Sequence, residues 1–259
     1  MKYKTIVYGA TLKGLGIACR NPKDTLILEP SGMVGHEFAS ALRFCKIAGQ
    51  LPEEAFGADL YKELMNRNAV AQNIVYVPVI PAILMNLMKQ YELHIAFSSV
   101  LIAKQARMNE IAVTTLFHHQ YIEYECEQFI DTTTDFAKME QYDIPYFANI
   151  AALLYDAACD RQLHAPNLTR IADRPLYVLR LAVDAHQSFD TYRHLIMEHV
   201  RQLQQTHPGI KLLHIADTLD VAAHAKAQLI HEELGIYAPS CLSSNLFDAI
   251  AEGMLIGGM

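Results

Sequence analysis

The first thirty residues place short apolar runs between turn-forming residues, in the order that predicts a strand, a helix and a second strand. Residues 5–8 form a β-rich run, and a glycine-spaced loop leads into a helix that we expect to end near Arg20. The continuous apolar run at 25–28 is typical of a strand buried on both faces, as in a parallel sheet. Together these runs predict a βαβ unit and an α/β fold.

Further along, apolar periodicity predicts a mixture of helices and strands in two regions. In the first region we expect helices at 38–47, 53–66 and 81–91, a strand at 94–105, a β-meander at 111–117 and 121–126, and a buried strand ending at 131. The second region begins near Pro145, with helices expected at 148–159, 191–206 and 221–234 and strands at 176–184 and 212–215. A helix near 246–254 follows.

The loop after the first strand has the spacing of a dinucleotide-binding fingerprint. Its residues are Gly9, Ala10, Thr11, Leu12, Lys13 and Gly14. In the pattern G-x-G-x-x-G, the first glycine permits a tight turn, the second admits the pyrophosphate, and the third lets helix and strand pack closely. Gly9 and Gly14 fill the first and third places, and Thr11 takes the second, where its hydroxyl could donate to phosphate. A helix beginning near Leu12 would direct its first N–H groups at that anion.

Glu29 supplies the acidic residue that the fingerprint places about 20 residues after the first glycine, at the end of the second strand. Its carboxylate can accept hydrogen bonds from a ribose diol, and it would repel a 2′-phosphate, which argues against NADP. The alternative is a βαβ turn with an incidental acid. The strand before the loop, the helix after it and the second strand favour nucleotide binding.

Two stretches of this unit resemble the FAD-dependent oxidoreductases of the glutathione-reductase type. They are Ile6-Val-Tyr-Gly-Ala-Thr-Leu-Lys-Gly-Leu-Gly-Ile-Ala18 and Leu26-Ile-Leu-Glu-Pro-Ser-Gly-Met-Val-Gly35. They are most similar to the branch whose loop reads V-Y-G-[GA]-T-P-A-G, in which threonine at the second position is normal. Leu12 replaces the proline of that pattern, and Val34-Gly35-His36 keeps one glycine of a Gly-Gly pair. The resemblance implies cofactor contacts from the residues that follow the acid, namely Pro30, Ser31, Gly35 and His36.

Three later segments extend the resemblance. Glu127-Gln-Phe-Ile-Asp-Thr-Thr-Thr-Asp135 resembles the family's F-I-D-A-T-G-D, with Thr134 in place of the glycine. Residues 95–100 resemble the strand whose valine backbone pairs with adenine, and residues 237–257 resemble the closing segment, where a loop and a helix N-terminus meet the flavin. The resemblance thus implies further FAD contacts from Val100, Thr132, Thr133, Thr134, Asn245 and Leu246.

Composition and charge exclude several other classes of protein. The chain has 259 residues, of which 52% are apolar and 19% are charged. This composition is sufficient for a sizeable hydrophobic core and argues against an intrinsically disordered protein. The formal net charge is −7 without a basic stripe, which argues against nucleic acid as a partner. No apolar run has the length of a signal peptide or membrane span, so we expect a soluble cytoplasmic protein.

Histidines and cysteines offer few other chemical sites. His118 and His119, taken as neighbours on a strand, would point to opposite faces and could not share a metal ion, so no metal site is predicted. His36 is either a proton donor beside the flavin or an ordinary loop histidine. Five scattered cysteines without a CxxC pair indicate reduced thiols. No residue is assigned as a catalytic acid or base.

The sequence therefore predicts a Rossmann-like FAD-binding domain with a parallel central sheet and a β-meander, formed by residues 1–145 and 235–259. Residues 146–234 would form a small α+β substrate or cap lobe. We expect an oxidoreductase that uses FAD to transfer a hydride or electrons through flavin N5, acting on a small-molecule substrate. The alternative is a non-catalytic module of the same ancestry that binds FAD or an adenine nucleotide. A homo-oligomer is compatible with the sequence.

Overall fold

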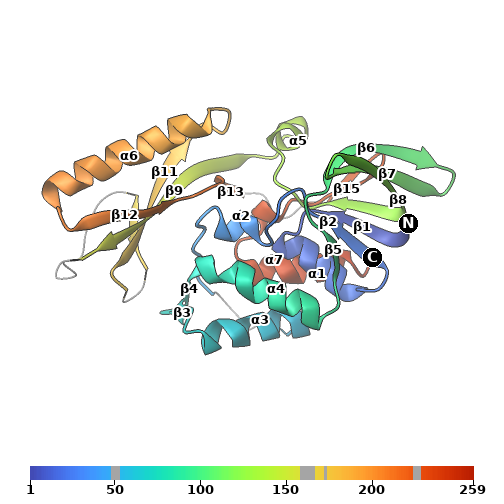
Figure 1. The fold of residues 1–259 in the computed structure, drawn as a ribbon, viewed down its shortest axis with the longest axis horizontal. Helices are drawn as coiled ribbons and strands as arrows, with labels where there is room; N and C mark the ends of the chain where they lie inside the picture. Colours follow the sequence, from blue (N-terminus) through green and yellow to red (C-terminus); the bar gives the residue numbers. More distant parts are fainter. Residues whose placement is uncertain (48–52, 158–166, 172–173, 224–228) are drawn as a thin grey trace.

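The residues that the computed structural model describes are 1–47, 53–157, 167–171, 174–223 and 229–259. Within them, an eight-stranded mixed sheet (the first sheet) lies beside a five-stranded antiparallel sheet (the second sheet), and helices cover both (Figure 1). Strands β3 (Val70–Ala71) and β4 (Ile74–Val75) pair separately. The mixed α/β fold expected from the sequence is confirmed.

The predicted βαβ unit forms the centre of the first sheet. It consists of β1 (Lys2–Tyr8), α1 (Leu12–Arg20) and β2 (Thr25–Leu28). β1 and β2 are parallel, with Thr5 beside Thr25 and Tyr8 beside Leu28. Both strands therefore end at the same edge of the sheet, directly before the glycine loop and Glu29.

The first sheet extends outward from β1 in two directions. On one side lie β2 and β5 (His94–Ala96), and on the other lie β8 (Gln120–Asp131), β15 (Gly235–Tyr237) and β14 (Ile230–Glu232). The strands from β5 to β15 are parallel. β2 and β8 lie on opposite sides of β1, so the order in which strands are added reverses there. The carboxyl ends of the strands at such a point are where open α/β sheets bind ligands.

Alternating side chains give the first sheet two buried faces. Val7, Ile27 and Ile130 belong to the core shared with the helices, whereas Ile6, Leu28 and Phe129 belong to the core shared with the meander. The helices on this side are α1, α3 (Ala55–Asn66), α4 (Ile80–Gln90) and α7 (Leu246–Ile256). The meander consists of β6 (Val100–Arg107), β7 (Glu110–Phe117) and the first half of β8.

Helices α1 and α7 cross at backbone contact. A Cβ built on Gly16 would overlap the carbonyl of Ile250, and one on Gly253 would overlap the carbonyl of Lys13. The missing side chains therefore allow the two helices to touch, and this contact places Gly253 of α7 against the start of α1.

The second sheet forms a lobe over residues 146–223, at the left of Figure 1. Its strands are β9 (Tyr146–Asp156), β10 (Leu168–Arg170), β11 (Leu176–Val183), β12 (Ile210–Ile215) and β13 (Asp220–Ala223). Helix α6 (Phe189–Thr206), expected at 191–206, packs on it, and its N-cap Ser188 accepts from the amide of Thr191. The remaining short elements are α2 (His36–Ala39), α5 (Phe136–Gln141), η1 (Val77–Val79) and η2 (Ser240–Leu242).

Three predicted helices are wrong. The one expected at 38–47 is limited to α2, because the chain turns at Leu42 with φ 50°. The one expected at 148–159 is strand β9, whose inner residues are buried on both faces, so the apolar alternation of a strand is absent from the sequence; residues 158–159 lie outside the described ranges. The third is the helix expected at 221–234. Its ends belong to strands β13 at 220–223 and β14 at 230–232, and residues 224–228 are not described.

The strand expected at 94–105 is two strands, β5 and β6. Ser98 has φ 54° between them, so the chain leaves the parallel sheet there and enters the meander. The pair His118–His119 is also not part of a strand. Both residues have positive φ, 44° and 66°, and they form the tight turn between β7 and β8.

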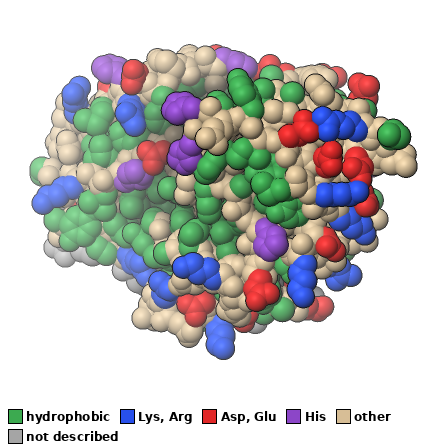
Figure 2. Space-filling model, turned by 45° about the vertical axis from the view of Figure 1, so that its right-hand side comes forward, with side chains coloured by type: hydrophobic (Ala, Val, Ile, Leu, Met, Phe, Trp, Pro, Cys, Tyr) green, Lys and Arg blue, Asp and Glu red, His purple; other side chains and the backbone are tan. Residues whose placement is uncertain are grey.

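Among the described helices, none combines the length and the apolar character needed to cross a bilayer. The face drawn in Figure 2 carries lysine and arginine side chains interspersed with aspartate and glutamate, and with hydrophobic side chains between them. Charges of the two signs are thus mixed on this face, which agrees with the lack of a basic stripe in the sequence.

Candidate functional site

The two glycines of the loop have the backbone roles that the fingerprint assigns them. Gly9 has φ +102°, and a Cβ built there would lie 2.9 Å from Cγ2 of Thr133. A Cβ on Gly14 would fall on the carbonyl oxygen of Gly9. The tight turn and the close approach of α1 to β1 therefore both require glycine.

Thr11 is the N-cap of α1. Its Oγ1 accepts from the amide of Gly14 at 3.0 Å and donates to Oγ1 of Thr132 at 2.8 Å. Thr132 in turn lies within hydrogen-bond distance of the carbonyls of Tyr8 and Gly9, at 3.1 and 3.2 Å. The hydroxyl of Thr11 is thus engaged with β8 and the helix end, and the expected bond from it to phosphate would require this network to open.

Glu29 lies against the glycine loop, as the sequence predicted. Its side chain is fully buried; Oε2 accepts from the amide of Ala10 at 2.6 Å, and Oε1 accepts from the amide of Ser31 at 2.7 Å. Both carboxylate oxygens are therefore satisfied by charge-assisted hydrogen bonds.

The predicted adenine-contacting segment passes beside Glu29. The amide of Ser99 donates to the carbonyl of Glu29 at 2.9 Å, and that of Ser98 donates to the carbonyl of Ser31 at 3.0 Å. Val100 follows directly as the first residue of β6, and it is 42% exposed. Pro30 and Ser31 follow Glu29 in the loop at the carboxyl end of β2.

Glu37 was not predicted, and it occupies the tip of α1. Gly35, with φ +63°, donates its amide to the carbonyl of Ala10 at 2.9 Å, which holds α2 beside the glycine loop. From α2, Oε1 of Glu37 accepts from the amide of Leu12 at 2.7 Å and from Oγ of Ser240 at 3.0 Å. The carboxylate thus lies at the N-terminal amide of the helix, where the dipole favours an anion.

Lys13 and Asn245 face the packing between helices α1 and α7. Lys13 is buried, and its Nζ pairs with Glu252 at 2.9 Å and donates to the carbonyl of Pro239 at 3.2 Å. Oδ1 of Asn245 accepts from the amides of Phe247 and Asp248 at 2.9 and 3.1 Å, so it caps α7. Leu246, next to it, is fully buried. The side chain of Asn245 therefore takes the amides that the resemblance assigned to flavin contact.

A cavity of about 210 Å³ lies between the glycine-loop region and the second lobe. It is lined by His36, Glu37, Thr134, Phe136, Thr218, Leu219, Val221 and Cys241. Nδ1 of His36 and Oε2 of Glu37 are buried there and have no hydrogen-bond partner among the described residues. Burial raises the pKa of the Cys241 thiol, so this cysteine is not activated as a nucleophile.

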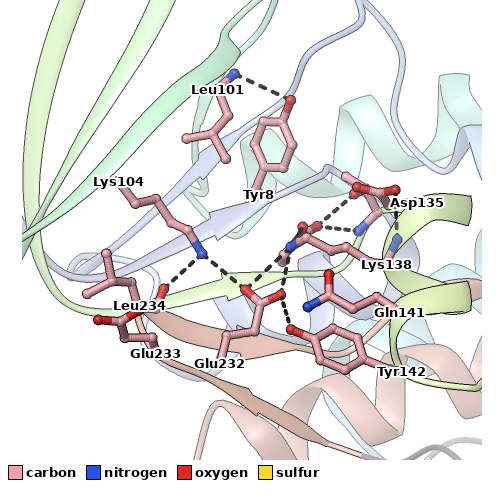
Figure 3. Close-up of a pocket in the computed structure, with 12 residues that line it drawn as sticks. Tyr8, Leu101, Lys104, Asp135, Lys138, Gln141, Tyr142, Glu232, Glu233 and Leu234 are labelled. Atoms are coloured by element: carbon pink, nitrogen blue, oxygen red, sulfur yellow. Dashed lines mark hydrogen bonds and ion pairs between the residues drawn. The ribbon is translucent and has the colours of Figure 1, made fainter.

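A larger cavity of about 620 Å³ opens on the meander side of the first sheet, and Figure 3 shows its polar side chains converging. Nζ of Lys138 lies 2.7 Å from Oδ2 of Asp131 and 3.0 Å from Oε1 of Glu232, and Nζ of Lys104 lies 3.0 Å from Oε2 of Glu232. Tyr142 donates to Glu232 at 3.2 Å. The four charged groups thus form one alternating network.

The network favours the charged forms of Glu232 and Lys138. Burial alone would raise the pKa of Glu232, but hydrogen bonds from Lys104 and Lys138 outweigh it and leave that pKa lowered. Burial alone would lower the pKa of Lys138, but Asp131 and Glu232 leave it raised. Oδ1 of Asp131 accepts from Oγ1 of Thr133 at 2.7 Å, so Thr133 faces this cavity.

The three predicted threonines therefore diverge. Thr132 is bonded to the glycine loop, Thr133 faces the large cavity with Tyr8, and Thr134 faces the small cavity with His36. The structure brings together the loop at 9–14, Glu29, Gly35 and Thr132. Thr133 borders both Gly9 and the large cavity, Val100 follows Ser99 beside Glu29, and Asn245 caps α7.

The junction between the lobe and the first sheet contains a buried ion cluster that the sequence did not indicate. Nε of Arg43 and Nε of Arg180 lie 3.5 Å from the two carboxylate oxygens of Asp220. Arg43 also donates to the carbonyls of Cys241 and Ser243 at 3.1 and 2.9 Å. Burial raises the pKa of Asp220, although both guanidinium groups oppose the shift. The cluster fixes β13 against the segment before α7.

The remaining candidates show no organised chemistry among the described residues. No group of three or more possible metal ligands is found there, and His118 and His119 lie at the hairpin turn. Burial raises the pKa of Cys45, and it raises those of Cys19 and Cys126 to about 12. Cys159 lies outside the described residues.

No family model matches the sequence, and no curated protein matches it. Similar folds are found among solved structures. p-Nitrophenol 4-monooxygenase PnpA from Pseudomonas putida DLL-E4 aligns with TM-score 0.59 and 10% identity over 99% of this chain and 79% of its own. A flavoprotein/dehydrogenase from Cytophaga hutchinsonii aligns with TM-score 0.61 and 10% identity over 100% of this chain and 77% of its own.

Aklavinone-11 hydroxylase, in a ternary complex with FAD and aklavinone, aligns with TM-score 0.58 and 14% identity over 99% of this chain and 61% of its own. At these identities the likeness establishes the fold, which extends over both the first sheet and the second lobe. The chain spans about three fifths of the hydroxylase and about four fifths of the monooxygenase.

Proposed function

We propose that this chain binds FAD and acts as a flavin-dependent oxidoreductase on a small molecule. The observation that carries the proposal is the buried carboxylate of Glu29, 2.6 Å from the amide of Ala10 and beside the N-terminus of α1. An acid at the end of the second strand, next to a glycine loop, is the arrangement that holds a ribose beside a diphosphate. The shared fold with an FAD complex supports it.

The ADP half of FAD would lie along the carboxyl ends of β1 and β2. In this proposal Glu29 exchanges a bond to backbone for bonds from the ribose hydroxyls, and Gly9, with φ +102°, makes the tight turn that brings the loop backbone to the phosphate. The amides at the start of α1 would bind the diphosphate, because the helix dipole places partial positive charge there. Ser31 and Val100 would border the adenosine. This arrangement of the ADP half resembles that of the glutathione-reductase type, in one branch of which threonine is normal at the place that Thr11 takes in the loop.

The flavin half would lie toward the second lobe, beside Thr134 and the segment before α7. When bound, FAD supplies transfer of a hydride or of electrons through its N5. The chain contributes position and exclusion of water: Leu219 and Val221 of the lobe and Phe136 line that side of the cavity. Nδ1 of His36, buried without a partner among the described residues, is the group we assign to hydrogen bonding with the flavin or the substrate.

The backbone at Gly9 and Gly14 and the carboxylate of Glu29 fit the cofactor. Two side chains hold amides that FAD would need: Asn245 holds those of Phe247 and Asp248, and Glu37 holds that of Leu12 at the site of the diphosphate. FAD binding in this proposal therefore includes a movement of Glu37.

The proposal is tested by titrating the purified chain with FAD and following flavin fluorescence and visible absorbance. We expect saturable binding, bleaching by dithionite and recovery of the colour in air. A chain that stays colourless and binds NADH would instead be a nicotinamide-dependent protein. A chain that binds only ADP would be an adenine-nucleotide module.

A matched pair of variants tests the role of Glu29. Glu29→Gln should weaken FAD binding by about tenfold or more, because a hydrogen bond to a charged group contributes about 1.5–3 kcal/mol. Glu127→Gln removes the same charge from an exposed position on β8 and should leave the affinity unchanged. Circular dichroism of both variants separates loss of binding from loss of folding. Equal FAD affinity in all three chains would overturn the assignment of Glu29.

A further inference from the structure

We propose that Glu37 is a built-in competitor for the cofactor diphosphate: its carboxylate holds the amide of Leu12 at the tip of α1 and must leave before FAD binds there. This inference rests on the proposed function. It concerns a residue that the dinucleotide fingerprint does not include, and it defines how readily the chain takes up its cofactor.

The position of Glu37 supports the inference. The amides of Gly14 and Lys13 face Oγ1 of Thr11 and Oγ of Ser240, at 3.0 and 3.4 Å, so polar neutral groups satisfy them. The amide of Leu12 is held at 2.7 Å by a carboxylate that enters from α2. A negatively charged group thus already occupies the place where the helix favours an anion.

The charge of the Glu37 carboxylate prevents it and a diphosphate from sharing the N-terminus of α1. A diphosphate at the same tip would lie beside the carboxylate of Glu37 in a buried site, where like charges repel strongly. Lys13 is the nearby cation on α1, but its Nζ is directed to Glu252 and the carbonyl of Pro239. Since this cation is engaged on the side of α7, Glu37 and the diphosphate compete for the same amide.

The two buried carboxylates differ in how firmly they are held. Glu29 has hydrogen bonds on both oxygens, whereas Oε2 of Glu37 is buried and has no partner among the described residues. Desolvation without a hydrogen bond is unfavourable, so the present place of Glu37 is the less stable of the two. Glu37 also borders the cavity of about 210 Å³, which offers space next to it. Glu37 is therefore the carboxylate that a diphosphate displaces, while Glu29 stays.

The inference predicts a specific change in affinity. A competing conformation reduces the apparent affinity by the fraction of molecules that are open. The stabilisation of an anion at a helix N-terminus corresponds to about 5- to 30-fold more molecules with Glu37 bonded to Leu12 than with that amide free. Glu37→Ala should therefore bind FAD about 5- to 30-fold more tightly than the parent chain. Glu37→Gln keeps the size of the side chain and removes its charge, so it should give a smaller gain.

The experiment compares FAD, ADP and adenosine as ligands for the parent chain, Glu37→Ala, Glu37→Gln and Glu63→Ala. Glu63 is a carboxylate on α3 that pairs with Arg67 at 3.4 Å, and its removal changes the net charge equally without touching the loop. Calorimetry or thermal-shift titration gives each dissociation constant. We expect tighter FAD and ADP binding in both Glu37 variants, unchanged adenosine binding, and no gain in Glu63→Ala.

The outcomes separate the two proposals. If the parent chain binds FAD and the Glu37 variants bind FAD and ADP with the same affinity, Glu37 is not a competitor, and the proposed function stands. An equal gain for adenosine would also overturn the inference, because adenosine carries no phosphate. If no variant binds FAD or ADP, both the inference and the proposed function fail. Glu37→Gln, which is isosteric, keeps the test valid if Glu37→Ala folds poorly.

Discussion

Arg43 and Asp220 form a buried ion pair across the junction of the two sheets, with Nε of the arginine 3.5 Å from the carboxylate. Arg180 pairs with the other carboxylate oxygen. Asp220→Asn would leave two guanidinium groups without their shared counter-charge. We expect this change to lower the free energy of unfolding by about 3–5 kcal/mol, which urea denaturation measures.

Asp217→Asn is the matched control for that measurement. It lies three residues earlier, its side chain is 57% exposed, and it faces His214 at 3.6 Å. Exposed ion pairs contribute about 0–1 kcal/mol, so this variant should unfold close to the parent chain. Similar losses in the two variants would mean that the junction cluster has no special importance for stability.

The contact of Gly14 with the carbonyl of Gly9 leads to a second prediction. Gly14→Ala forces a methyl group against backbone that cannot move without separating α1 from β1. We expect a loss of about 1–3 kcal/mol in stability from this overpacking, measured by thermal or urea unfolding. Gly32→Ala places its methyl group in open space and serves as the control. Equal stability of Gly14→Ala and the parent chain would contradict the close approach.

The network at the large cavity makes stability depend on pH. The pKa of Glu232 is lowered in the folded chain, so its contribution is present above the unfolded value of about 4.3 and is lost as pH falls through the folded value. The pKa of Lys138 is raised, so its contribution is present below about 10.4 and is lost as pH rises through the folded value.

Glu232→Gln should therefore be less stable than the parent chain by about 1–3 kcal/mol near neutral pH, because Lys104 and Lys138 lose their shared acceptor. The difference should shrink below about pH 4, where the parent carboxylate also becomes protonated. Urea denaturation across this range measures both effects. A difference that does not change with pH would show that packing, not charge, explains the loss.

The sequence predicted those positions of the candidate site that depend on local order along the chain. Gly9, Gly14 and Glu29 follow from a short βαβ unit, in which register and loop geometry are set by neighbours along the chain. Glu37 could not be found this way. Its contact with Leu12 depends on how the loop after Glu29 and the four-residue helix α2 fold back onto the start of α1. Even so, the segment Gly35-His36-Glu37 does place a carboxylate close to the expected diphosphate.

The errors in the fold have a similar origin. Strand β9 is buried between its neighbours and α6, so its side chains do not alternate between apolar and polar, and its pattern resembles that of a helix. Thr132, Thr133 and Thr134 look equivalent in the sequence, yet they lie in irregular backbone after the end of β8, and their side chains face different sides. Which cavity Thr133 or Thr134 faces depends on the elements that pack around residues 132–134, and these are distant in the sequence.

The crossing of α1 and α7 has a consequence for the order in which the chain folds. Lys13 donates to the carbonyl of Pro239, which lies 226 positions later, and Gly16 meets Ile250 of α7. During synthesis the apolar side of α1 has to wait until residues 239–253 have been made before it gains this cover. Contacts between such remote segments are slow to form. The region around the glycine loop is therefore expected to be among the last regions to fold, and a nascent chain would need protection there until residues 239–253 are available.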